Sequence, residues 1–395
     1  MMRSLLIGFL YSIGDGMARW CQALASMRWP QAPLRRGLRL VGLWVGPVVL
    51  CLLMAEVASR VDDLVFSGVP LGASPDRERD LLVQDEYGVR GRPHGRYQRW
   101  SLNSFGFRGP EIEYAPSKTR LMVLGASETF GLYESEGQEY PSNLQRELAR
   151  AGLDVEVINA SVAGMALPSM IKYWDSWASR FRPQFVLLYP SPQFYLDTEP
   201  PRAGTGSPEP RPPSGMSSRF LARLKDQAKT SPLLRSVRTW WVVHRRTRTW
   251  DRTYFFSSEP ALDRLDQFEG DLAELATRVA HTGAVPVLVT HAFKMPRELS
   301  RADRAELEYY RVFFPRALAE AFCPFEDAAR TRMMELASRR GWPLIDAARP
   351  LSGRRELFAD PVHFNDDGSG AMGRLLAGAL VRLLEQRGVQ RHALQ

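Results

Sequence analysis

A serine, a histidine and an aspartate have the types and positions to carry out chemistry together. Ser127 follows an apolar run and a glycine in the stretch LMVLGASETFG, at residues 121–131. His363 lies in the stretch DPVH, three residues after Asp360. A serine hydroxyl is a poor nucleophile until a base takes its proton, usually a histidine oriented by a carboxylate. The pattern predicts Ser127 as the nucleophile, His363 as the base and Asp360 as the orienting carboxylate.

Simpler interpretations exist for each of these residues. Ser127 could be a turn residue after a strand, and the DPVH stretch is what favours a reactive role. His291 also follows an apolar run and is plausible by position, although a structural role is the simpler interpretation. Two other motif classes are excluded. Thr129 stands where the GxSxG elbow has its second glycine, and no lysine follows Gly131 as it would in a phosphate-binding P-loop.

Short apolar runs alternate with helical periodicity through the body of the chain, which predicts a three-layer α/β/α fold with a mostly parallel five-stranded sheet. We expect strands at residues 121–124, 155–158, 185–189, 285–290 and 344–345, and helices at 141–151, 168–181, 262–280, in a zone at 302–339 interrupted near Pro315 and Pro324, and from Asn365 to Gly388. Such sheets bind ligands beyond the carboxyl ends of their strands, and Ser127 lies at that edge.

Four blocks of the sequence resemble those of the SGNH (GDSL-type) hydrolase family. GASETFG at 125–131 resembles the family's first block, G-D-S-x-T-x-G, and DPVH at 360–363 resembles its last, D-x-x-H. NASVAG at 159–164 resembles the glycine block after the second strand. NSFGFRG at 103–109 resembles a lead-in of bacterial members linked to surface polysaccharides. The resemblance covers roughly residues 100–390, apart from an insertion.

The resemblance implies a catalytic triad and an oxyanion hole. It assigns attack on an ester carbonyl to Ser127, proton transfer to His363 and the orientation of His363 to Asp360. It also implies that the oxyanion accepts hydrogen bonds from the backbone N–H groups of Ser127 and Gly164. The side-chain amide of Gln193 would be the third donor. No metal or organic cofactor is implied.

Two positions depart from the family pattern. Ala126 replaces the aspartate of the first block, a residue that is neither nucleophile nor base, so its loss need not abolish activity. Gln193 stands in SPQF at residues 191–194, where the third block, G-x-N-D, has an asparagine. Gln193 has the same amide on a longer stem, and losing one oxyanion donor costs roughly 100- to 1,000-fold in rate.

An apolar run near the N-terminus predicts a membrane-spanning helix at residues 38–58. Its only charges, Arg39 and Glu56, lie near its ends, and spanning a bilayer takes ~20 residues. The preceding segment, residues 1–37, has five arginines and one acid, so the positive-inside rule predicts that it is cytoplasmic. We therefore expect a single pass of the inner membrane with the rest of the chain in the periplasm. A buried core helix and a cleaved signal peptide are the alternatives.

The remaining segments complete the expected organisation. Residues 59–115 form a lead-in without a long periodic pattern, and residues 116–390 form the hydrolase-like domain. Within that domain, residues 196–261 are an insertion rich in proline, arginine and tryptophan. A lid, a sugar-binding rim, a membrane patch and a basic surface loop all fit this composition. The net charge of +8 favours anionic partners, but no nucleic-acid-binding motif accompanies it.

Together these features predict a membrane-anchored, extracytoplasmic serine esterase. The expected substrate is an ester-linked acyl group, most simply O-acetyl, on a glycan or a lipid-linked glycan. An O-acetyltransferase that uses the same three residues is one alternative. A non-catalytic component of cell-envelope polysaccharide assembly is another, motivated by Ala126 and Gln193.

Overall fold

The computed structural model divides the chain into two compact units. One comprises Met1–Pro75 and Ser214–Gln227, and the other comprises Asp76–Pro213 and Ala228–Gln395. The structure describes residues 33–67, 71–72, 81–97, 100–196, 218–221, 223–224, 232–251, 253 and 255–389. Most of the predicted cytoplasmic segment, 1–37, and part of the predicted insertion lie outside these residues.

The smaller unit contains a long helix, α2 (Pro33–Ser67), which includes the apolar run at 38–58. The carboxylate of Glu56 on this helix accepts hydrogen bonds from the Ser218 hydroxyl at 2.7 Å and from the backbone N–H of Phe220 at 2.9 Å. A short stretch of the insertion therefore belongs with α2 and not with the hydrolase-like domain. Among the described residues, no helix combines the length and the hydropathy needed to cross a membrane.

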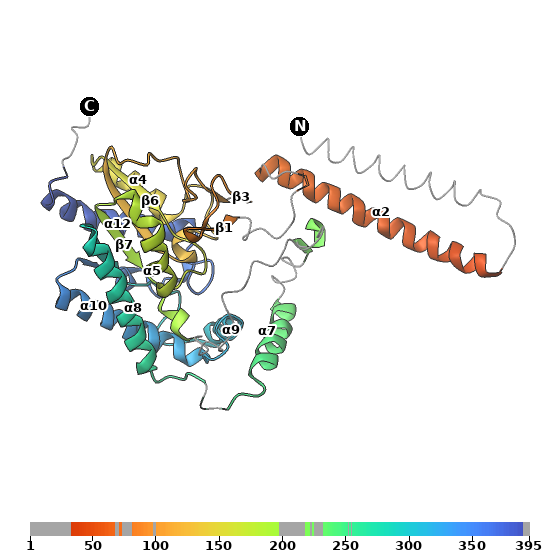
Figure 1. Cartoon of the computed structure of the whole chain (residues 1–395). Coiled ribbons are helices and arrows are strands. Elements are labelled where there is room, and N and C mark those ends of the chain that lie inside the picture. The colour runs from red at the N-terminus through yellow and green to blue at the C-terminus, as the bar shows by residue number, and fades with distance from the viewer. Residues whose placement is uncertain are drawn as a thin grey trace. The chain divides into compact units, whose positions relative to one another are not determined.

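The larger unit is built on a five-stranded parallel sheet, as predicted (Figure 1). Its strands are β5 (Thr119–Gly125), β6 (Val155–Asn159), β7 (Phe185–Tyr189), β8 (Val285–Val289) and β9 (Leu344–Ile345), in the order β6-β5-β7-β8-β9. The chain reverses its direction of travel across the sheet between β5 and β7. In open parallel sheets, ligands bind at this switch point, beyond the carboxyl ends of the strands.

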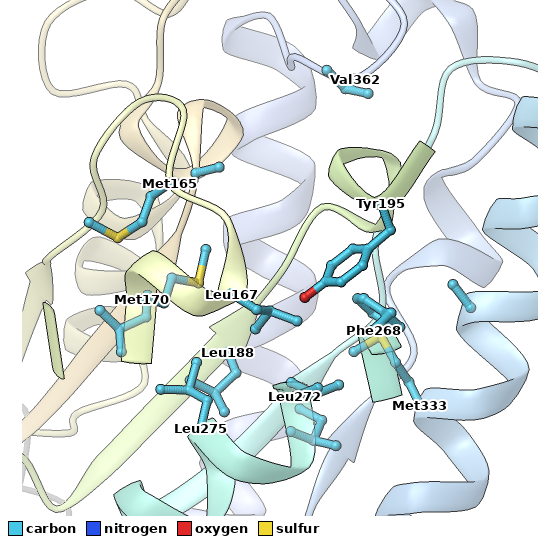
Figure 2. Packing of buried hydrophobic residues seen from close by; sticks show 14 of the residues in the cluster. Met165, Leu167, Met170, Leu188, Tyr195, Phe268, Leu272, Leu275, Met333 and Val362 are labelled. Carbon is cyan, nitrogen blue, oxygen red and sulfur yellow. The ribbon is translucent and has the colours of Figure 1, made fainter. Parts of the chain in front are cut away.

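Helices cover both faces of the sheet, which confirms the three-layer prediction. Alternate side chains of each strand point to opposite faces. Leu121 and Val123 of β5 pack in the cluster that includes α4 (Tyr140–Arg150) and α12 (Asp366–Gln386). Met122 and Leu124 point the other way, toward a cluster that includes α5 (Leu167–Ser176), α8 (Leu262–His281) and α10 (Phe322–Arg340). Figure 2 shows Leu188 of β7 within the second cluster, near Leu272 and Leu275 of α8.

Two helix predictions are wrong in detail. The helix expected at 168–181 ends at Ser176, and a 3₁₀ turn, η2 (Ala178–Phe181), follows it. The break falls at Trp177, whose buried ring packs against Phe181 and lies under the guanidinium of Arg90. Pro324, expected as an interruption, lies in the first turn of α10, where proline is tolerated because the first N–H groups of a helix have no partner within it.

The lead-in and the insertion contain elements that the sequence did not reveal. Two small hairpins pair β1 (Leu82–Asp85) with β2 (Gly88–Gly91) and β3 (Arg96–Tyr97) with β4 (Trp100–Ser101). A 3₁₀ turn, η3 (Pro192–Leu196), follows β7. The insertion includes a 16-residue helix, α7 (Pro232–Thr247). This helix packs against α9 (Arg301–Tyr310), which begins the zone expected at 302–339.

Candidate active site

Ser127 is the first residue of a single helical turn, α3 (Ser127–Phe130), which begins immediately after β5. Glycine is needed before it, because a Cβ on Gly125 would lie 2.0 Å from the hydroxyl oxygen of Thr129. Gly131 ends the turn with a φ of 86°, a conformation that favours glycine. The sequence GASETFG therefore folds into a tight strand-to-helix turn that leaves Ser127 partly exposed at the ligand edge of the sheet.

Neighbouring segments hold this turn in place. The Asn159 side-chain amide, at the end of β6, donates to the carbonyl of Thr129 at 2.9 Å. The Thr129 hydroxyl lies 2.8 Å from the Tyr140 hydroxyl of α4. Arg108, in the lead-in, donates from its buried guanidinium to the carbonyl of Phe130 at 2.5 Å. The NSFGFRG and NASVAG blocks thus contribute structural support to the turn that carries Ser127.

The structure brings Asp360 and His363 together, as the sequence predicts. Both lie on the loop between the 3₁₀ turn η6 (Arg355–Leu357) and α12. His363 Nδ1 is 2.7 Å from one carboxylate oxygen of Asp360. The other oxygen accepts the backbone N–H groups of Val362 at 3.0 Å and His363 at 2.9 Å. Three hydrogen bonds therefore fix this carboxylate, and the carboxylate orients the imidazole.

The loop that follows α3 packs against the segment that contains His363. The backbone N–H and the hydroxyl of Ser135 both donate to Asp366, at 2.8 and 2.7 Å. The ring of Tyr133 lies 5.2 Å from the imidazole of His363, centroid to centroid. Ser369, in the first turns of α12, donates its hydroxyl to Glu134 at 2.6 Å. Segments more than 200 residues apart in the sequence, 231 for Ser135 and Asp366, thus meet at the edge where Ser127 lies.

The nucleophile and the base are not hydrogen-bonded to each other. Ser127 Oγ has a carboxylate oxygen of Glu128 as its partner, at the long distance of 3.4 Å. Among the described residues, His363 Nε2 is buried without a hydrogen bond. Without substrate, catalytic hydrogen bonds are often long or open and tighten when substrate binds. The open Nε2 is the position from which His363 would take a proton.

The charges around His363 make it a stronger base. Burial opposes its protonation, but the Asp360 carboxylate, with help from Glu128 and Glu134, outweighs burial and raises the pKa of His363. Burial also opposes ionisation of Asp360, and the pairing with His363 outweighs it and holds the pKa of Asp360 below its usual range. The pair therefore favours an ionised carboxylate beside an imidazole that gains protons readily.

Sequence reasoning missed a second buried polar cluster beside Ser127. His291, just after β8, has Nδ1 3.0 Å from a carboxylate oxygen of Glu326 on α10 and Nε2 3.6 Å from Glu128. All three side chains are buried. Burial opposes the charge on His291, but the two carboxylates outweigh it and raise the pKa of His291 to about 10. With a carboxylate on each side of its ring, His291 is therefore favoured in the imidazolium form at neutral pH.

Glu128 also carries charge at the site. Burial opposes its ionisation, but His291 and His363 outweigh burial and hold the pKa of Glu128 below its usual range. Glu128 thus interacts with both histidines and with the hydroxyl of Ser127. The signal in the sequence was its position directly after Ser127, which gave no indication that it would face a histidine from another loop.

The predicted oxyanion donors lie on the expected loops, but Gln193 has another partner. Ser127 begins a helical turn, where the first N–H groups have no partner within the helix. Gly164, after β6, adopts a φ of 80°. Gln193 is fully buried in η3, and its amide nitrogen donates to Glu326 at 2.8 Å. One N–H of the amide is therefore committed to the His291 cluster, and the oxyanion role of Gln193 stays a prediction.

A cavity of about 270 Å³ borders the His291 cluster. Its lining includes His291, Glu326, Phe293, Arg330 and Arg349. Neither Ser127 nor His363 is among the described residues that line it. The cavity therefore contacts His291 and not the predicted base.

No protein-family model matches the chain, and no curated protein matches it. Several solved structures of ester hydrolases are similar in fold. The lipase/acylhydrolase from Enterococcus faecalis has 15% identity and a TM-score of 0.41, covering 70% of this chain and 100% of that one. The esterase EstA from Pseudoalteromonas sp. has 11% identity and a TM-score of 0.38, covering 68% and 99%. A catalytic mutant of Axe2, an acetylxylan esterase from Geobacillus stearothermophilus, has 13% identity and a TM-score of 0.38, covering 71% of this chain and 99% of that one.

These values are too low for an activity to be transferred to this chain. All three identities are 15% or less, and all three TM-scores lie below 0.5. The function therefore has to be inferred from the geometry of the site itself.

Proposed function

We propose that this chain is a serine ester hydrolase in which Ser127 is the nucleophile, His363 the base and Asp360 the orienting carboxylate. The observation that supports it best is the Asp360–His363 pair. His363 Nδ1 lies 2.7 Å from the Asp360 carboxylate, and His363 Nε2 has no hydrogen bond among the described residues. Both residues lie on the loop that packs against the segment following Ser127. A hydroxyl, an oriented imidazole and a carboxylate at one sheet edge are the groups that acyl transfer requires.

In the proposed reaction, Ser127 Oγ attacks the ester carbonyl carbon while His363 Nε2 takes the hydroxyl proton. The negative charge that develops on the carbonyl oxygen accepts hydrogen bonds from the backbone N–H groups of Ser127 and Gly164. Collapse of this intermediate breaks the ester bond, and His363 returns the proton to the departing alcohol. Water then attacks the acyl-serine, again with His363 as base, and releases the acid.

For the substrate, we propose an ester-linked acyl group, most simply O-acetyl, on a glycan or a lipid-linked glycan. We also propose that residues 38–58 anchor the chain in the inner membrane, with the larger unit in the periplasm. The uninterrupted apolar sequence supports the anchor, and so do the exposed apolar side chains along this stretch of α2, which include Val48 and Leu53. A reporter fused at the C-terminus would test the topology, and a cytoplasmic signal would contradict it.

Turnover of a short aryl acetate by the full chain in detergent tests the activity. We expect hydrolysis that is lost in Ser127→Ala, while the exposed control variant His281→Ala keeps the wild-type rate. No turnover by a folded wild-type chain, or equal turnover by Ser127→Ala, would contradict the proposal.

Two alternative functions predict different outcomes of the same assay. An O-acetyltransferase would use the same acyl-serine but pass the acyl group to a sugar hydroxyl, so acetylated glycan would accumulate in place of free acetate. A non-catalytic assembly component is favoured by Ala126 and by the commitment of the Gln193 amide to Glu326. That alternative predicts no reaction with either type of acceptor.

A further inference from the structure

Helix α7 presents tryptophans to solvent and buries smaller side chains. Trp240 is 65% exposed and Trp241 is 54% exposed, whereas Thr239 and Val243 are each 8% exposed. The buried side of α7 packs on the segment around α9, where Arg246 donates to the carbonyl of Val312 at 3.0 Å. A surface helix normally turns its largest apolar groups toward the core. This inversion indicates that the outer face has a binding role.

The outer face of α7 is also strongly basic. Val237, Trp241, His244 and Arg248 recur at helical spacing, so they share one side, and they are all exposed. Between Pro232 and Arg248 the sequence has five arginines and no acid. The partner of this face should therefore be anionic and should accept indole rings.

Another side chain already occupies one face of each exposed indole. The ring of Trp240 stacks on His244 at 5.2 Å with an interplanar angle of 5°. The guanidinium of Arg245 lies 5.2 Å from the ring centroid of Trp241. Sugar-binding surfaces use open aromatic faces for stacking, which these contacts reduce. Indoles beside arginines instead suit the boundary of a membrane, where tryptophan enters the headgroup layer and arginine pairs with phosphate.

We propose that the outer face of α7, defined by Val237, Arg238, Trp240, Trp241, His244, Arg245 and Arg248, binds the surface of a membrane that contains anionic phospholipid. The tryptophans enter the headgroup region and the arginines contact lipid phosphates, with their alkyl stems along the apolar boundary. The proposal is independent of the esterase reaction and of any anchor at residues 38–58.

Quenching of tryptophan fluorescence by brominated lipids tests this directly in the full chain. The chain is placed in nanodiscs of phosphatidylcholine, or of equal parts phosphatidylcholine and phosphatidylglycerol, with the upper acyl chains brominated. In the mixed nanodiscs, we expect the brominated lipids to quench less tryptophan emission in W240F/W241F than in the wild type. The control Trp342→Phe, two residues after the end of α10, should leave the quenched emission unchanged.

A charge variant separates lipid binding from simple proximity to the membrane. Arg238→Gln/Arg245→Gln should reduce quenching in the mixed nanodiscs and leave the phosphatidylcholine nanodiscs unaffected. Circular dichroism confirms that each variant is folded, which is expected because the substituted side chains of α7 are exposed. If the quenched emission of W240F/W241F equals that of the wild type, α7 does not contact the membrane, and an acidic glycan or a protein would be its partner.

Discussion

Two buried histidine–carboxylate pairs lie on neighbouring loops of this protein, and they differ in what they can do. His363 has Nδ1 2.7 Å from Asp360, and His291 has Nδ1 3.0 Å from Glu326. In both rings, Nε2 has no hydrogen bond among the described residues. By the usual geometric test of a base held by a carboxylate, either histidine would qualify.

The difference lies in where the carboxylates are placed around each ring. His291 has Glu326 on one side and Glu128 at 3.6 Å on the other, which raises the pKa of His291 to about 10. His363 has one direct carboxylate partner, Asp360 at 2.7 Å, which outweighs burial and raises the pKa of His363. A second carboxylate beside Nε2 therefore favours the charged form of His291 and lies on the side from which a base would take a proton. The comparison shows that geometry selects candidates and that local charge decides between them.

The largest effect should come from removing the proposed base. Because His363 is needed to take the proton of Ser127, His363→Ala should lower kcat for a short aryl acetate by roughly 10,000-fold or more. Initial rates measured with excess substrate give this number, with His94→Ala, an exposed site, as the control. A His363→Ala chain that keeps most of its activity would remove the basis for distinguishing the two histidines.

The counterpart variant at His291 should affect stability first. In His291→Gln, two buried carboxylates lose their cation, and we expect the free energy of unfolding to fall by about 3 kcal/mol at pH 7. Urea denaturation measures this, with the exposed His281→Gln as control. The folded-state pKa of His291 is raised, so its stabilising contribution is complete below pH 6.5 and is lost as pH rises toward about 10. The free energies of unfolding of the variant and the wild type should therefore converge in alkaline buffer. A variant that is as stable as the wild type but inactive would instead make His291 the base.

Substitution of Gln193 should have a smaller effect, and it tests whether this residue serves the His291 cluster or the reaction at Ser127. Its amide donates to Glu326, so Gln193→Ala should lower the free energy of unfolding by roughly 1–3 kcal/mol by leaving a buried acceptor without its partner. The accompanying loss in kcat should be less than about tenfold, whereas removal of a true oxyanion donor costs about 100- to 1,000-fold. A loss in the larger range would show that the amide turns toward the oxyanion during the reaction.

Glu128 should influence how the activity depends on pH, because its charge acts on His363 as well as on His291. Since protonated His363 is inactive as a base and its pKa is raised, kcat/KM of the wild type should fall on the acid side at a pH above 6.5. Removing the nearby negative charge in Glu128→Gln should move this acid limb to lower pH. Glu335→Gln, an exposed change on α10, should leave the limb in place. An unchanged limb in Glu128→Gln would mean that Glu128 does not influence His363.

The sequence was sufficient for the sheet and for the Asp360–His363 pair because both rest on local patterns. The strands of a sheet covered on both faces read as short apolar runs, and all five were placed. Asp360 and His363 are three residues apart, so their contact follows from a short loop. The strand before Ser127 and the helix after His363 then place both residues at one edge.

The second histidine pair could not be predicted because its contacts have no local pattern. Gln193 and Glu326 are 133 residues apart, and His291 and Glu326 are 35 apart on different elements. Helix α7 was missed for a different reason. Val237, Trp240 and Trp241 face outward, so the pattern of apolar residues does not mark an inner face as it would in a helix of the core.

Labelling with a fluorophosphonate tests the central claim most directly, because the reagent reacts only with an activated serine. The full chain, His363→Ala, Ser127→Ala and His291→Gln are treated in parallel at a temperature where all four are folded. We predict a label on Ser127 in the wild type and in His291→Gln, and no label in the other two. Equal labelling of Ser127→Ala and the wild type, or loss of labelling in folded His291→Gln with retention in His363→Ala, would contradict the account.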